Sequence, residues 1–290
     1  MRVTGEEPTG LATALALAAG DPRPCALAVA GDPGGVVHLS GGAVTAVLSP
    51  GAPDAVRVLL ASGRVSEHDW STLQHPAATG RLGPELLSRA LVGPQELQVV
   101  CMMAAADAAF AMAAGRIEGC TPAATCPSPA LAAPQGIAPD WLLQETERRL
   151  AALASLRTPL SPGTDRVRAT PAARTSELPG ARRDILRYAD GRLSAGGIAL
   201  LLGRGLFAVT IELSRMAGEG LVEVAAPEPA PQPHPCPQPY PQERAVADQP
   251  PPPRALGRLP LRRRGASGIN DVLPLRPLAA RHARPADRAP

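Results

Sequence analysis

The feature that most constrains the fold of this chain is the pattern of glycines and apolar residues between residues 181 and 224. Apolar residues recur at helical spacing in three short stretches: 181–189, 195–202 and 206–217. A glycine follows closely after each stretch, and glycine permits the positive φ with which many helices end. Leu221–Val224 has the composition of a strand, and Arg192-Leu193 leaves room for a shorter one. The pattern predicts three helices and two small strands.

This order of elements is that of a winged helix-turn-helix. Residues 178–225 resemble the winged-helix transcriptional regulators of the MarR-like kind. The resemblance implies that the third helix enters the major groove of DNA, where its outward residues contact bases and phosphates. The candidate DNA-binding residues are Thr210, Ser214 and Arg215 on the third helix, Arg204 at the turn before it, and Arg182 and Arg183 on the first helix.

The same segment departs from this family in three ways. Phe207 and Ile211 are apolar on the expected reading face, so they are also candidates for binding a protein. Residues 182–224 hold six Arg and five acidic residues, a net charge of +1, which is weak for electrostatic DNA binding. Proline-rich sequence begins at Pro227, so the β-hairpin wing is expected to be truncated.

Residues 1–120 predict a separate, small mixed α/β domain. Three strand-like segments joined by glycine turns, 25–30, 36–40 and 43–48, predict an antiparallel meander, and 116–120 could close it. Helical patterns lie at 9–19, 53–62, 66–73, 84–91 and 94–114. This succession, with Leu59–Ser66 and Ala105–Phe110, resembles the PATAN domain of prokaryotic signalling proteins. The resemblance implies an interaction or regulatory module and supplies no catalytic residues.

The rest of the chain predicts linkers, one helix and a tail. Residues 121–139 and 158–177 are expected to be linkers. Residues 140–157 form an amphipathic pattern in which Glu145 pairs with Arg149 at i,i+4, and this helix packs on a neighbour or forms a dimer. Residues 226–290 are rich in Pro and Arg, with a net charge of +5, and are expected to be a disordered tail.

Composition excludes several classes of function. The five cysteines have no paired spacing, and no histidine lies near the closest pair, Cys120 and Cys126, so neither a disulfide framework nor a metal site is expected. Residues 31–35 lack the Lys-Ser/Thr of a phosphate loop, and no histidine stands in a recognised catalytic setting. No catalytic residue or cofactor is therefore expected. The sequence shows no secretory signal, and no apolar run approaches the ~18 residues that a membrane span needs, which favours a cytoplasmic location.

Together these observations predict an α+β protein that acts as a non-enzymatic regulator. One hypothesis is a transcriptional regulator that binds DNA through the winged helix and a partner through the N-terminal domain. In this hypothesis a homodimer gains affinity by binding two half-sites. The alternative is a signalling adaptor or scaffold in which both folded parts bind proteins.

Overall fold

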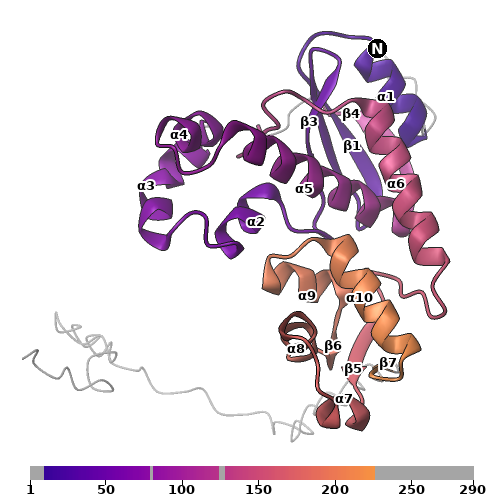
Figure 1. The fold of residues 1–290 in the computed structure, drawn as a ribbon. Coiled ribbons are helices and arrows are strands. Elements are labelled where there is room, and N and C mark those ends of the chain that lie inside the picture. Colours follow the sequence, from indigo (N-terminus) through magenta and orange to yellow (C-terminus); the bar gives the residue numbers. More distant parts are fainter. Residues whose placement is uncertain (1–9, 79–80, 124–127, 226–290) are drawn as a thin grey trace, which may run out of the picture. The chain divides into compact units, whose positions relative to one another are not determined.

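The fold was examined in a computed structural model, which describes residues 10–78, 81–123 and 128–225. Predictions that concern residues 226–290, including the Pro/Arg-rich tail, lie outside the described residues. The described part is a mixed α+β structure with two antiparallel sheets (Figure 1). This agrees with the predicted fold class at the level of α+β.

The first sheet has the strand order β3-β2-β1-β4. Its strands are β1 (Cys25–Asp32), β2 (Gly35–Ser40), β3 (Ala43–Leu48) and β4 (Arg116–Pro122). All three pairings are antiparallel, so the predicted meander and its closing strand are confirmed. The tight turn between β2 and β3 depends on Gly41 and Gly42, whose φ angles are +60° and +77°.

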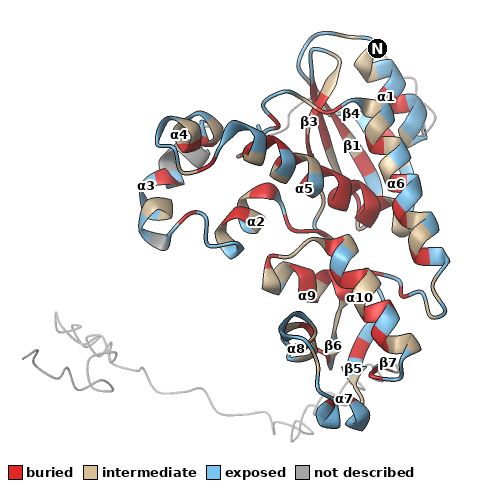
Figure 2. Cartoon of the chain, in the orientation of Figure 1, coloured by how far each residue is buried: buried red, intermediate tan, exposed pale blue. Residues whose placement is uncertain are grey.

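Six helices accompany this sheet among the described residues. They are α1 (Leu11–Ala19), α2 (Ala55–Ala61), α3 (Glu67–Ala78), α4 (Leu82–Ser88), α5 (Pro94–Ala114) and α6 (Pro139–Ala154). α5 packs against β3, α2 and α6, and α1 packs against β1 and β4. Figure 2 shows buried residues concentrated on the strands and on α5.

α5 is the core helix of this N-terminal part. Six of its alanines are buried together with Phe110, and the small alanine side chains let neighbouring elements approach closely. By length and composition alone, α5 is also the one helix in the described ranges that could cross a membrane. Because 67% of its apolar 18-residue stretch is buried inside the protein, length and composition are weak evidence for a membrane span. α5 has the burial of a core helix.

The second sheet has the order β6-β5-β7. The C-terminal part comprises β5 (Arg166–Ala169), α7 (Pro171–Thr175), α8 (Gly180–Leu186), β6 (Asp190–Ser194), α9 (Ala195–Leu202), α10 (Leu206–Gly218) and β7 (Val222–Val224). The predicted order of three helices and two small strands is present. Ser194 caps α9, since its Oγ accepts a hydrogen bond from the amide of Gly197 at 3.4 Å.

One prediction about this part is wrong. Residues 158–177 were expected to be a linker, yet they contain α7 and the central strand β5. β5 pairs antiparallel with both β6 and β7. A third strand therefore exists, but it comes before α8 rather than after α10.

A single cluster of buried apolar residues runs through both parts. It extends from Leu15 on α1, through Phe110 on α5, to Leu213 on α10. α10 contacts α5 and α6 directly. The third helix of the C-terminal part therefore lies against the N-terminal part.

Candidate functional site

Two of the predicted DNA-binding side chains are buried in α10. Thr210 is 0% exposed and Ser214 is 1% exposed, so the prediction that they face outward is wrong. The Thr210 hydroxyl donates to the carbonyl oxygen of Leu206 at 2.8 Å. The Ser214 Oγ accepts a hydrogen bond from the amide of Leu160 at 3.2 Å. Both hydroxyls satisfy groups inside the protein and lie away from any surface that could contact DNA.

Two of the predicted arginines are held by ion pairs. Arg182 lies 2.5 Å from Glu212 and 2.6 Å from Glu219. Arg204 lies 2.8 Å from Asp184. These pairs join α8 to α10 and to the turn before it, and they offset the charge that phosphate binding would use.

The other two predicted arginines, Arg183 and Arg215, are exposed. Arg215 lies 4.0 Å from Glu212, at the limit of an ion pair, and its side chain is 57% exposed. Arg183 makes no side-chain hydrogen bond or ion pair within the described part of the chain. The six candidate DNA-binding residues therefore fall into three groups of two: buried hydroxyls, arginines held in ion pairs, and exposed arginines.

The two candidate protein-binding residues pack inside the molecule. Phe207 is half-buried, and its ring makes a T-shaped contact with the ring of Phe110 on α5, with centroids 5.4 Å apart. The Arg149 guanidinium lies 5.1 Å from the centroid of the Phe207 ring. Ile211, one turn later, is also half-buried against the core. Both residues of this apolar stripe thus pack against the core, and Phe207 contacts the N-terminal part directly.

The residues that make this contact centre on Asp107, and we call them the Asp107 junction: Asp107, Arg149, Gly205, Leu206 and Phe207. Asp107 is 3% exposed on α5. Its Oδ2 accepts a hydrogen bond from the amide of Leu206 at 2.9 Å, and its Oδ1 accepts one from the amide of Phe207 at 3.1 Å. These are the first two amides of α10, so a carboxylate from another helix caps α10 at its positive end.

Arg149 supplies the opposing charge in the junction. Its Nη1 lies 2.7 Å from Oδ1 of Asp107, and its Nε lies 2.8 Å from Glu145. The predicted Glu145–Arg149 pair is confirmed, but Arg149 is 1% exposed and not a surface residue. Gly205 lets the helix approach, because an added Cβ would lie 2.7 Å from Oδ2 of Asp107.

The pKa values of the two carboxyl groups in contact with Arg149, those of Asp107 and Glu145, are shifted in opposite directions. Burial raises the pKa of Asp107, while the Arg149 guanidinium and the two α10 amides act against that rise. Hydrogen bonds from Arg148, and then from Arg149, lower the pKa of Glu145 to about 2. The negative charge on Asp107 therefore depends on its partners in the junction.

The low pKa of Glu145 predicts a loss of stability in acid. The ionised form favours the folded state, so its contribution is complete above pH 4.5 and is lost as the pH falls toward 2. The free energy of unfolding in urea should fall less steeply over this range for Glu145→Gln than for the natural chain. Glu147→Gln, which changes an exposed glutamate of the same helix, is the control. Equal slopes for all three proteins would contradict this assignment.

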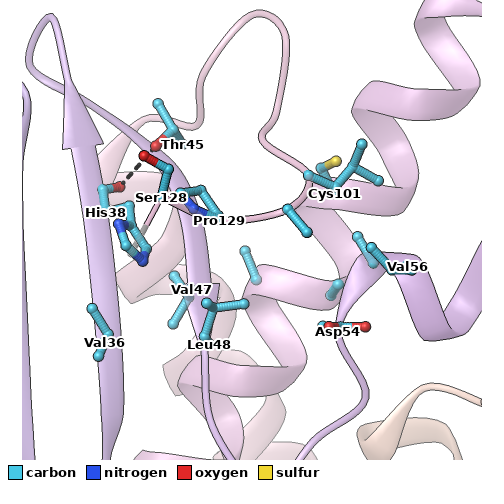
Figure 3. A pocket seen from close by; sticks show the side chains of 16 residues that line it. Val36, His38, Thr45, Val47, Leu48, Asp54, Val56, Cys101, Ser128 and Pro129 are labelled. Carbon is cyan, nitrogen blue, oxygen red and sulfur yellow. Dashed lines mark hydrogen bonds between the residues drawn. The ribbon is translucent and has the colours of Figure 1, made fainter. Parts of the chain in front are cut away.

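A cavity of about 330 Å³ lies between β2, β3, α2, α5 and residues 128–131 (Figure 3). Its walls are mainly apolar, and its polar members include His38, Thr45 and Asp54. Thr45 donates to the carbonyl oxygen of His38 at 3.3 Å, and Asp54 caps α2 through the amide of Arg57.

The titratable groups of this cavity are poorly suited to catalysis. Burial lowers the pKa of His38 and raises the pKa of Cys101 to about 12. At neutral pH the thiol is therefore protonated and weakly nucleophilic. Among the described residues, no group of His, Cys, Asp and Glu is arranged to hold a metal ion. The cavity has the character of an apolar binding space.

Sequence reasoning missed the Asp107 junction. Asp107 stands alone among buried alanines, and Arg149 follows Leu142 by seven residues on the apolar side of α6. A charged residue on the apolar side of each of these two helices was the signal from which the sequence could have predicted the junction.

No protein-family model matches this chain, and neither a curated protein nor a solved structure matches it.

Proposed function

We propose that this protein is a non-enzymatic signalling adaptor. In this proposal the C-terminal part is a winged-helix module whose third helix, α10, is bound to the N-terminal part. The observation that carries the proposal is the Asp107 junction. The first two amides of α10 are occupied by a buried carboxylate, so they are not available to a DNA phosphate. The candidate reading residues Thr210 and Ser214 also face inward.

The second sheet supports the winged-helix assignment in modified form. A hairpin wing needs two strands after the third helix, and β7 is the one such strand within residues 128–225. β5 lies beside β7 and takes the place of the missing strand. The proposed module thus includes residues 166–225 and has no hairpin to place against DNA.

The adaptor needs an exposed surface for its partner, and α5 offers one. Val99 is 57% exposed and Met103 is 48% exposed, although both are large apolar residues. They are one helical turn apart, so they share a face of the helix. Met103 also receives a long hydrogen bond from Arg149, at 3.9 Å from its sulfur, which places this surface next to the junction.

Partner capture tests this surface. The natural chain, immobilised at full length, should recover a stoichiometric protein from a lysate of its source cells. A Val99→Glu/Met103→Glu double variant should lose that protein, because charge on both residues opposes apolar burial. Leu201→Glu on α9 is the matched control, since Leu201 is an equally exposed apolar residue at 53%. If the double variant retains every partner, the proposed surface is wrong.

A transcriptional regulator is the second candidate function, favoured by the exposed Arg183 and Arg215. It would require α10 to leave the Asp107 junction. A gel shift of duplex genomic fragments by the full chain at low salt separates the two functions. If the protein is an adaptor, it should cause no salt-sensitive retardation of the DNA. Retardation that disappears in Arg215→Ala would favour the regulator.

A further inference from the structure

Four arginines surround a cleft in the C-terminal part. They are Arg168 on β5, Arg174 at the end of α7, Arg183 on α8, and Arg187, which follows α8. The cleft has a volume of about 660 Å³, and alanine and leucine side chains from the same elements form its apolar wall. None of the residues that line it belongs to the Asp107 junction.

The charge of this cleft is largely uncompensated. Arg168, Arg174 and Arg183 make no side-chain hydrogen bond or ion pair with any described residue. Arg187 lies 3.8 Å from Asp184, a long contact at an exposed position. By contrast, Arg182 on the same helix α8 is held by two glutamates. The charge of Arg182 is thus offset by acids, whereas the four arginines of the cleft have one long contact to an acid among them.

One carboxylate, Asp190, lines the cleft with the four arginines, which leaves the described lining with an excess of positive charge. Asp190 and Glu223 stand opposite Arg168 in the strand register, but neither forms an ion pair with it. Four guanidinium groups at close quarters repel one another, and a multivalent anion relieves that repulsion.

The chemistry of the lining defines the ligand. Guanidinium groups bind phosphate oxygens with two parallel hydrogen bonds and stack on planar aromatic rings. Apolar walls favour a ligand that carries a ring as well as charge. The volume of about 660 Å³ is within the range of small-molecule sites. The tail is an unsuitable occupant, because residues 226–290 carry a net charge of +5.

We propose that this cleft binds a nucleotide, with Arg174 and Arg183 holding its phosphates. Nucleic acid is the less favoured ligand. A duplex contacts several phosphates across a broad surface, whereas Arg182 and Arg204, two other arginines of this part, are already paired with carboxylates. The site is independent of the partner surface on α5.

The test is calorimetric titration of the full chain with ADP and GDP, and separately with pyrophosphate and a single-stranded DNA dodecamer. At least one nucleoside diphosphate should bind, and more weakly as salt rises. Arg174→Gln and Arg183→Gln should each weaken binding about tenfold, the loss expected for a charge-assisted contact. Arg192→Gln and Arg215→Gln change exposed arginines outside the cleft and should leave affinity within about twofold.

Four results would overturn the proposal. They are the absence of binding by either diphosphate, equal weakening by the cleft and control variants, pyrophosphate binding as tight as that of the diphosphates, and tighter binding of the DNA dodecamer. The third would show that the base adds nothing, and the fourth would assign the cleft to nucleic acid. Thermal unfolding of every variant confirms that the fold is intact, as expected for substitutions of exposed side chains.

Discussion

An Arg149→Leu variant is expected to lose about 3–5 kcal/mol of unfolding free energy, the cost of leaving a buried partner charge uncompensated. Arg149 is 1% exposed, and its removal leaves Asp107 buried without a cation. The carboxyl group would then bind a proton more readily and cap α10 less well, because desolvation would act with less opposition. Urea unfolding at neutral pH measures the loss.

Arg148→Leu is the matched control for this variant. Arg148 is the preceding residue of α6 and shares the partner Glu145, but its side chain is 63% exposed. Because this ion pair is exposed to solvent, its loss should lower the free energy of unfolding much less than the loss of Arg149. If the two leucine variants have the same stability, Arg149 does not hold the junction together in the way that its contacts imply.

A Gly203→Ala variant should be destabilised by about 2–5 kcal/mol, the sum of left-handed backbone strain and overpacking. Gly203 ends α9 with φ +59°, a conformation that costs an L residue energy. An added Cβ would lie 2.1 Å from Cβ of Ala61 on α2 and 3.1 Å from the carbonyl oxygen of Arg57. The substitution would therefore strain the turn and also push the C-terminal part from α2.

Gly220→Ala separates these two causes. Gly220 also has positive φ, +76°, but an added Cβ there would meet nothing within 4 Å. Only the backbone strain remains, about 1–2 kcal/mol. Urea unfolding of both variants should show a clearly greater loss for Gly203→Ala. Equal losses would mean that α2 and α9 do not pack as closely as the structure has them.

Much of the local structure could be predicted because glycine turns and helix caps act over a few residues. Gly41-Gly42 marked the hairpin, and Ser194 marked the start of α9. β5 was missed because it has four residues, of which only Val167 is buried, so its sequence carries no clear alternation. Its role comes from β6 and β7, which lie later in the chain.

The candidate site was harder to predict because its contacts are distant in sequence. Asp107 and Arg149 are 42 residues apart, and helical periodicity does not reveal which helices face each other. Thr210 shows a second limit. Its hydroxyl bonds to the backbone one turn earlier, so a polar side chain can be buried on a helix face that its polarity would place in water.

The position of β5 also decides where this protein can be divided. β6 and β7 each pair with β5, and neither pairs with the other. A fragment covering 178–225, the span that resembles a winged helix, would therefore lack the strand that joins its sheet. Two strands with unpaired backbone edges invite association between copies. The smallest autonomous C-terminal unit must begin before Arg166, so its boundary is set by strand pairing and not by the helices.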